Sequence, residues 1–339
     1  MKISFLVTYY NQAEFVPKSL DSILAIDLPE EWEILVGDDG STDGTQDRVR
    51  EYMDRYPGRI QLYEMPREPG KKYQSVMRAS ENRLNLLGHA TGDCCCFLDG
   101  DDYYLDRSFV REAIRVLENQ TNVTAVAFGF AFSENGKLTE EFLLPAESGF
   151  IDQSAYIRGM YTHAGAAVFR NTWDGPRLES LRKLRFFDDN NIMMSSLACG
   201  EMYYINRIVY AYRQVTGSVY TSMNFLEKAT LNVQGFDVDR QLIGKDLENA
   251  LIRRMANPLL SMYLWRNALP KYLKGGKLEQ YRDGSKHLEG SVAYRLLIWP
   301  ELPKKERAEV RKIIHRAARI HPEQACRQGI KHLLKGNKA

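Results

Sequence analysis

The sequence predicts an α/β fold in which a Rossmann-like, mostly parallel sheet is flanked by helices and followed by a helical C-terminal extension. Three observations lead to this prediction. Short, wholly apolar segments alternate with segments of helical periodicity through the first third of the chain, a pattern typical of a parallel sheet covered on both faces. Polar clusters follow the apolar segments, and from about Phe225 onward Leu, Arg, Ala and Lys recur at helical spacing.

The individual elements follow from the same two periodicities. The run ISFLV begins the sheet, and apolar residues at helical spacing follow it; a second predicted helix is closed by Pro57-Gly58. We expect strands at 3–7, 33–37, 60–63, 94–98, 123–132 and 202–212, and helices at 15–24, 46–56 and 74–87.

Composition excludes several classes of protein. Hydrophobic residues make up 44% and charged residues 27% of the 339 residues, as in ordinary globular proteins. The net charge of +2 gives no case for a nucleic-acid partner. No apolar run approaches the length of about 18 residues that spans a bilayer, and the N-terminus lacks signal-peptide features. We therefore expect a cytoplasmic protein, and we interpret Cys94, Cys95 and Cys96 as buried apolar residues.

Polar clusters stand where three of the predicted strands end. They are 8–11 after the first strand, 38–43 after the second and 99–102 after the fourth. In open parallel sheets ligands bind at the carboxyl ends of the strands. The coincidence of polarity and position therefore predicts a binding site at that edge of the sheet.

The cluster Asp99-Gly100-Asp101-Asp102 places three carboxylates within four residues. Their mutual repulsion needs compensation, and hard oxygen ligands suit Mg²⁺ or Mn²⁺, whose remaining ligands are often substrate phosphates. The alternative interpretation is a solvated turn, because Asp-Gly is a common turn dipeptide. The position after a buried strand favours the metal.

The second cluster begins Asp38-Asp39-Gly40, where the glycine permits a tight turn. Thr42 or Asp43 is placed to cap the following helix. A carboxylate at Asp38 or Asp39 is then free to accept a hydrogen bond from a nucleotide base.

These residues carry a resemblance. The segments FLVTYYNQAEFVPKSLDSIL, EILVGDDGSTDGT, HATGDCCCFLDGDDYY, FFDDNN and YAYRQVTGS, in this order over roughly residues 1–220, resemble the family-2 glycosyltransferases with the GT-A fold. The resemblance implies a catalytic domain at 1–222, with a nucleotide-sugar-binding half at about 1–104 and an acceptor half at about 105–222. The helical region is then 223–339.

The family's roles carry over to matching positions. The resemblance implies that Asp101, with Asp99, binds Mn²⁺ or Mg²⁺, and that Asp189 is the catalytic base, with Asp188 as the alternative. His163 lies where such enzymes place an acceptor loop, and Gly217-Ser218 match a segment near the donor diphosphate. The positions implied for nucleotide binding are Thr8, Tyr10, Asp38, Asp39, Asp99 and Arg213.

The segment before the fourth strand departs from the family's usual pattern. Its basic residues Lys71, Lys72 and Arg78 are candidates for contact with the donor diphosphate. The alternative interpretation is a solvated loop and helix face.

The function that follows is transfer of a sugar, with inversion, from a nucleotide-diphosphate sugar to a saccharide or lipid-linked acceptor. The resemblance favours UDP. One alternative is a nucleotidyltransferase, which is expected to carry a glycine-rich loop after the first strand, whereas this chain has Thr8-Tyr9-Tyr10-Asn11. The other is a non-catalytic nucleotide- or carbohydrate-binding protein.

The C-terminal residues 304–335 form a basic amphipathic pattern. Its apolar stripe comprises Val310, Ile313, Ile314 and Ala317, and Ile330, Leu333 and Leu334 continue it. One interpretation is peripheral contact with an anionic membrane at the inner face of the cell membrane. The other is packing on the catalytic domain or in an oligomer, because apolar stripes usually serve a core.

Overall fold

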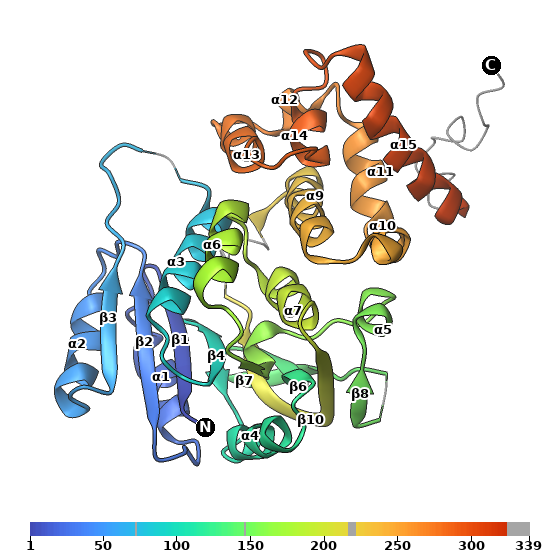
Figure 1. Cartoon of the computed structure of the whole chain (residues 1–339). Helices are drawn as coiled ribbons and strands as arrows, with labels where there is room; N and C mark the ends of the chain where they lie inside the picture. Colours follow the sequence, from blue (N-terminus) through green and yellow to red (C-terminus); the bar gives the residue numbers. More distant parts are fainter. Residues whose placement is uncertain (72, 146, 216–221, 324–339) are drawn as a thin grey trace. The chain divides into compact units, whose positions relative to one another are not determined.

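The structure is a computed structural model that describes residues 1–71, 73–145, 147–215 and 222–323. The chain forms two compact units (Figure 1). The first, here called the sheet unit, comprises Met1–Lys71, Arg78–Gln153 and Met160–Ser218. The second, the helical unit, comprises Lys72–Met77, Ser154–Gly159 and Val219–Ala339.

The sheet unit is built on one mixed sheet. Its strand order is β3-β2-β1-β4-β9-β6-β10-β5, with β7 paired to β6 and β8 paired to β10. The strands are β1 Ile3–Tyr9, β2 Trp32–Asp38, β3 Ile60–Glu64, β4 Cys94–Asp99, β5 Tyr103–Tyr104, β6 Val123–Glu134, β7 Lys137–Phe142, β8 Gly149–Ile151, β9 Ala167–Arg170 and β10 Glu201–Arg213.

The first four strands confirm the predicted parallel sheet. β3, β2, β1 and β4 are parallel neighbours, and their apolar residues are largely buried because helices cover them. Beyond β4 the sheet is mixed: β9 runs antiparallel to both β4 and β6, while β6 and β10 are parallel. The four residues of β9 are too few to show a periodicity, so the sequence did not reveal this strand.

Helices of the sheet unit pack on this sheet as the predicted alternation requires. α2 packs against β2 and β3, and α4 packs against β6 and β9 (Figure 1). In α1, Val16, Leu20 and Ile23 are buried, as their helical spacing predicted. The helices are α1 Val16–Leu24, α2 Thr45–Arg55, α3 Ser75–His89, α4 Phe109–Asn119, α6 Gly175–Leu184 and α7 Asp189–Leu197, with a 3-10 turn, η1, at Ala164–Ala166. The short helix α5, Gln153–Ile157, belongs almost wholly to the helical unit, as does the start of α3.

Strand register brings the three polar clusters to one edge. Thr8 at the end of β1 lies opposite Gly37 of β2 on one side and Asp99 of β4 on the other. Tyr9 lies opposite Asp38. Segments that are distant along the chain therefore end side by side at the carboxyl edge, as predicted.

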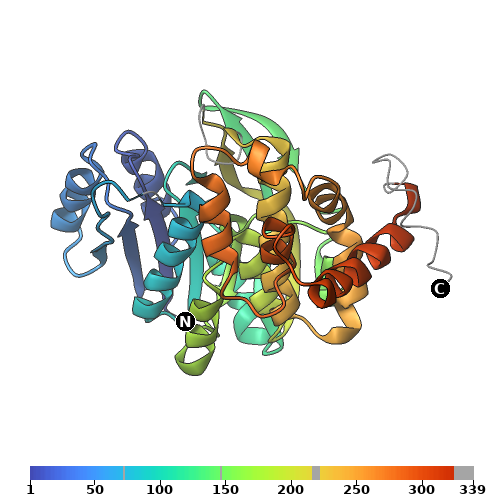
Figure 2. The same ribbon diagram turned by 90° about the horizontal axis from the view of Figure 1, so that it is seen from above.

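The helical unit contains the predicted C-terminal helices (Figure 2). The first begins at Phe225 with a capping box, in which Asn224 accepts from the backbone N–H of Glu227 and the Glu227 side chain accepts from that of Asn224. In the part of the chain that the structure describes, no helix has the length and apolarity to cross a membrane. The helices are α9 Phe225–Leu242, α10 Glu248–Arg254, α11 Ala256–Leu264, α12 Leu269–Tyr272, α13 Lys277–Ser285, α14 Val292–Leu297 and α15 Lys304–Ile320, with a 3-10 turn at Lys245–Leu247.

The amphipathic stripe of α15 is used inside the helical unit. Val310, Ile314 and Ala317 are fully buried and Ile313 is partly exposed. α15 packs against α10, α11 and α14. Within the described residues the stripe therefore covers neighbouring C-terminal helices. Residues 330–334 lie outside the described residues.

A buried carboxylate holds α14 in place. Asp237 of α9 accepts hydrogen bonds from the Ser291 hydroxyl at 2.7 Å and from the backbone N–H groups of Val292 and Ala293 at 2.9 and 2.8 Å. Burial raises the pKa of Asp237 to about 6, although these hydrogen bonds oppose the shift. The carboxylate thus supplies hydrogen-bond acceptors for backbone N–H groups in the first turn of α14, which have no acceptor within the helix.

We expect Asp237→Ala to lower the free energy of unfolding by about 3 kcal/mol, because it leaves buried N–H groups without an acceptor. Asp237→Asn keeps one acceptor oxygen, so its free energy of unfolding should fall clearly less. Urea denaturation followed by circular dichroism measures both. An alanine variant as stable as the wild type would show that Asp237 does not hold α14.

Candidate active site

One buried arginine organises the acidic edge of the sheet. Arg83 of α3 donates from Nη2 to both carboxylate oxygens of Asp99, at 2.6 and 2.9 Å, and from Nη1 to the backbone oxygen of Phe187 at 3.4 Å. Thr8 Oγ1 donates to the same carboxylate at 3.1 Å. Burial disfavours the charge of Asp99, but the Arg83 guanidinium outweighs it and holds the pKa of Asp99 below its usual range.

Arg83 also faces the second acidic pair. Burial disfavours its charge, but the charges of Asp99, Asp189 and Asp188 overcome this and raise its pKa above the usual value. The structure thus brings together the two acidic motifs predicted as metal ligand and base. No role was predicted for Arg83 from the sequence. The signal that could have found it is a basic residue on the helix just before the acidic motif of β4, whose crowded carboxylates need a compensating charge.

The third carboxylate of the cluster is committed to the fold. Asp102 is buried and accepts from the Tyr210 hydroxyl at 2.5 Å and from the Arg213 backbone N–H at 2.6 Å. Burial, with the charges of Asp101 and Asp99, raises its pKa well above the usual value. The turn before it requires glycine, because a Cβ at Gly100 would lie 2.1 Å from the ring of Tyr9.

The negative charge of Asp101 is only partly compensated. Burial raises its pKa to about 6, and the charge of Asp99 adds to the shift, while Gln12 and Arg213 oppose it only in part. A nearby cation would reverse such a shift. Asp101 therefore fits the predicted direct metal ligand.

One group of described side chains has ligand atoms close enough to share a cation, and it does not include Asp101. The described residues Asp99, Asp102 and His163 each place one such atom within 4.8 Å of the others. Both Asp102 oxygens already accept hydrogen bonds, which makes this group a poorer fit than one that includes Asp101.

The two carboxylates at the start of α7, Asp188 and Asp189, make different contacts. Asp188 caps the helix: its carboxylate accepts from the Asn191 backbone N–H at 3.2 Å, and the Asn191 side chain completes the capping box. Burial and the charge of Asp189 raise the pKa of Asp188 to about 6. Asp189 lies in the first turn, partly exposed, with Oδ2 3.5 Å from Nε2 of His163. The carboxylate without a capping role is thus the predicted base.

His163 is held rigidly beside this pair. It is buried, its ring stacks on Tyr210 with centroids 4.9 Å apart, and Nδ1 accepts from the Gly165 backbone N–H at 3.1 Å. An accepting Nδ1 leaves the proton of a neutral imidazole on Nε2. The N–H of His163 therefore points toward Asp189.

Two arginines hold the carboxylate on the predicted nucleotide side. Arg78, considered above for the diphosphate, donates from Nε to Asp39 Oδ1 at 2.6 Å, and Arg67, which the sequence analysis missed, donates from Nη2 to the other oxygen. The guanidinium of Arg67 lies 3.7 Å from the centroid of the exposed Tyr10 ring. The Asp39 carboxylate, which was expected to be free, thus already accepts hydrogen bonds from two arginines. A nucleotide base would have to bind to its remaining lone pairs.

Asp38 differs from its neighbour. It is fully buried, and its Oδ1 accepts from the Ser41 backbone N–H at 2.9 Å and from the Gln46 amide at 2.6 Å. The carboxylate therefore stabilises the turn after β2, away from the surface on which Tyr10 is exposed.

The remaining candidates take varied positions. The guanidinium of Arg213 lies 4.6 Å from the Phe15 ring centroid and 5.3 Å from that of Tyr103. The exposed Lys71 pairs with Glu68 at 2.5 Å. Lys72, Gly217 and Ser218 lie outside the described residues.

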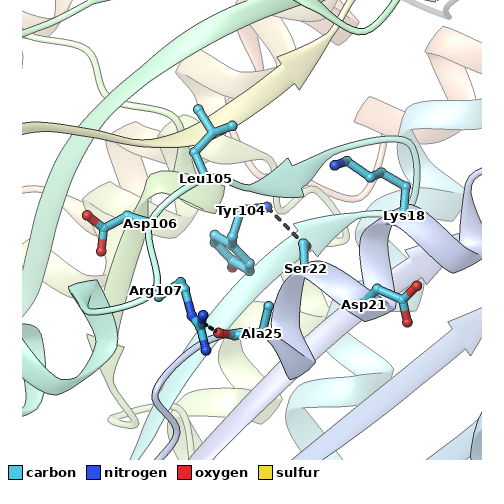
Figure 3. A pocket seen from close by; sticks show the side chains of 8 residues that line it. All are labelled: Lys18, Asp21, Ser22, Ala25, Tyr104, Leu105, Asp106 and Arg107. Atoms are coloured by element: carbon cyan, nitrogen blue, oxygen red, sulfur yellow. Dashed lines mark hydrogen bonds between the residues drawn. The ribbon is translucent and has the colours of Figure 1, made fainter.

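A surface pocket of about 210 Å³ lies between α1 and the segment after β5 (Figure 3). Tyr104 N–H donates to Ser22, and Arg107 donates to the Ala25 oxygen. None of the predicted site residues lines it. The pocket is therefore separate from the acidic edge.

We expect Arg83→Gln to lower the free energy of unfolding by about 3 kcal/mol near pH 7, because it leaves Asp99 charged and unpaired. The loss should shrink toward about pH 4. Without its partner, the buried Asp99 of the variant favours the protonated form and takes up a proton as the pH falls, whereas wild-type Asp99, whose pKa is depressed, keeps its charge and its pairing over this range. Urea denaturation at both pH values, with the exposed Arg48→Gln as control, measures this. An equal loss at both values would contradict it.

Comparison with known proteins places these features in a family. Residues 4–174, a little over half of the chain, match the family model described as Glycosyl transferase family 2. The structure resembles the crystal structure of S. aureus TarS 1–349 in complex with UDP-GlcNAc, with a TM-score of 0.59 at 18% identity over 97% of this chain and 92% of that one.

Curated relatives match parts of the chain. EpsE of Bacillus subtilis, provisionally named a glycosyltransferase, is 32% identical over 40% of this chain and 45% of its own length. The poly(ribitol-phosphate) beta-glucosyltransferase of Bacillus spizizenii is 28% identical over 37% of this chain and 18% of its own length.

A third relative is the UDP-Glc:alpha-D-GlcNAc-diphosphoundecaprenol beta-1,3-glucosyltransferase WfgD of Escherichia coli. It is 27% identical over 42% of this chain and 51% of its own length. In each of these three relatives the match spans about half of the length or less. The family match and the fold agree: the chain belongs to glycosyl transferase family 2 and has the GT-A fold.

Proposed function

We propose that the enzyme transfers a sugar from a UDP-sugar to a saccharide or lipid-linked acceptor, with inversion, using Mn²⁺ or Mg²⁺ and Asp189 as general base. The donor and acceptor classes are supported by the names of relatives, one of which uses UDP-Glc and a diphosphoundecaprenol-linked sugar. The observation that carries the proposal is the position of Arg83, which faces Asp99 and Asp189 together.

The acidic edge fits a divalent cation. Asp101 and Asp99 offer hard oxygen ligands at the end of β4, and the raised pKa of Asp101 reflects a negative charge that lacks compensation. A cation held there would offset the charge that develops on the departing nucleoside diphosphate. Thr8 and Arg83 hold Asp99 in place, so its orientation is set before any ligand arrives.

Transfer is then a single displacement. The acceptor oxygen forms a bond to the anomeric carbon as the bond from that carbon to the diphosphate oxygen breaks, and the electron pair leaves with the diphosphate. Asp189 takes the acceptor's hydroxyl proton. Attack opposite the leaving group inverts the anomeric carbon. His163, whose N–H points toward Asp189, is proposed to lie in the acceptor half of the site.

The nucleotide is proposed to bind beside Tyr10 and Asp39. Tyr10 is exposed and offers an aromatic face, over which Arg67 now lies. The carboxylate of Asp39 has lone pairs left for an N–H of the base. Arg78 donates to this carboxylate from the buried side, which holds it in place.

We expect Asp101→Asn to abolish Mn²⁺-dependent stabilisation by UDP, while the thermal midpoint without ligand stays near that of the wild type. A ligand at 100 times its dissociation constant adds about 2.7 kcal/mol, so its loss is measurable by thermal denaturation. Asp47→Asn, an exposed carboxylate on α2, is the control with the same change of charge. Undiminished Mn²⁺-dependent stabilisation in Asp101→Asn would refute the assignment.

We expect Asp189→Asn to keep its affinity for the donor and lose about 10²–10⁴-fold in the rate of transfer, because proton removal occurs in the transition state. Asp188→Asn should lose much less, since asparagine is also a good helix cap. Rates with a panel of saccharide acceptors, alongside donor binding by calorimetry, measure both. The opposite ranking would make Asp188 the base.

A further inference from the structure

Three arginines of the helical unit converge on one tryptophan. Trp299 follows α14 and is buried, with the guanidinium carbons of Arg266, Arg307 and Arg311 at 5.1, 5.7 and 5.8 Å from its ring centroid. Arg266 follows α11, and the other two lie on α15. α11 and α15 pack against each other (Figure 1). Arginines from two segments therefore place their positive charges around one aromatic ring.

In the part of the chain that the structure describes, these cations have no acidic partner. Among the described residues, no carboxylate lies within 4.0 Å of the guanidinium nitrogens of Arg266, Arg307 or Arg311. Four other arginines of the same unit are paired: Arg240 and Arg316 share Glu248, Arg282 contacts Glu279 and Glu301, and Arg295 contacts Glu306 and Glu309. What sets Arg266, Arg307 and Arg311 apart is that they surround the same tryptophan ring.

Several of their donors are unused. Arg266 Nη1 donates to the Tyr263 backbone oxygen at 2.5 Å, and Arg307 Nη2 donates to the Pro300 backbone oxygen at 3.0 Å. These are the hydrogen bonds that their terminal nitrogens make within the described residues, and Arg311 makes none there. The other terminal N–H groups, and the whole guanidinium of exposed Arg311, can serve an anion.

The charges at this position disfavour one another. Burial lowers the pKa of Arg266, and the positive charge of Arg311 lowers it further. Stacking on Trp299 and Tyr263 fixes the plane of the Arg266 guanidinium. An anion would relieve the repulsion and use donors that are already oriented.

We propose that Arg266, Arg307 and Arg311 form a binding site for a phosphate group, and that this group belongs to a phosphate-bearing acceptor. Planar guanidinium groups match phosphate oxygens in pairs, which favours phosphate over a single point-like anion. The acceptor part rests on the proposed function. It is supported by two relatives whose names specify poly(ribitol-phosphate) and a diphosphoundecaprenol-linked sugar.

The test is calorimetric titration of the full chain with inorganic pyrophosphate in EDTA, which removes divalent cations from the acidic edge. The double variant R266Q/R311Q should bind pyrophosphate about tenfold more weakly than the wild type, since two charge-assisted contacts are lost. The matched control K312Q/R319Q removes the same charge from exposed positions of α15 and should bind within about twofold of the wild type.

R266K/R311K keeps the charge and loses the planar fork, so it should bind with intermediate affinity. R311Q alone changes an exposed side chain and guards against misfolding of the double variant; it should also weaken binding. Equal weakening in R266Q/R311Q and K312Q/R319Q, or no pyrophosphate binding by the wild type, overturns the proposal. Arginine-dependent binding to phosphatidylglycerol vesicles without binding to pyrophosphate also overturns it, in favour of a lipid surface.

The titration needs neither donor nor turnover. If pyrophosphate does not bind, the proposal that the enzyme transfers a sugar from a UDP-sugar is unaffected. If the enzyme does not transfer a sugar, the phosphate site remains, but it can no longer be assigned to an acceptor. The two proposals can therefore fail separately.

Discussion

The acidic edge of the sheet depends on the ion pair between Arg83 and Asp99. Removing charges from water is costly, and the cost is met only when a partner and further hydrogen bonds are in place. Arg83 supplies both, since it bonds both oxygens of Asp99 and the backbone oxygen of Phe187, just before the second acidic pair. One cation from α3 thereby permits carboxylates from β4 and α7 to stand near each other.

The hydrogen bonds then assign the carboxylates to different tasks. Asp102 and Asp188 are bound to backbone N–H groups and hold the chain in shape. Asp99 is held by Arg83 and Thr8. Asp101 remains with a raised pKa, and Asp189 remains partly exposed beside His163. Asp101 and Asp189, to which we assign no structural role, are the carboxylates to which the proposed function assigns metal binding and proton removal.

Sequence reasoning located the edge because strand ends and polar clusters are local patterns: Thr8, Asp39 and Asp101 each follow an apolar run. It did not find what depends on tertiary contacts. Arg83 and Arg67 look like solvated helix or loop residues until folding sets them against Asp99 and Asp39. β9 is too short for a periodicity, and the stripe of α15 does not reveal what covers it.

The central claim is that Asp101 carries a divalent cation beside the donor diphosphate. The direct measurement is a crystal structure of the protein with UDP and Mn²⁺, with the ion located by anomalous scattering. The account predicts a manganese ion bound by Asp101 and by diphosphate oxygens, with Arg83 still paired to Asp99. An ion bound instead by Asp102 and His163, or UDP bound with no ion near Asp101, would contradict it.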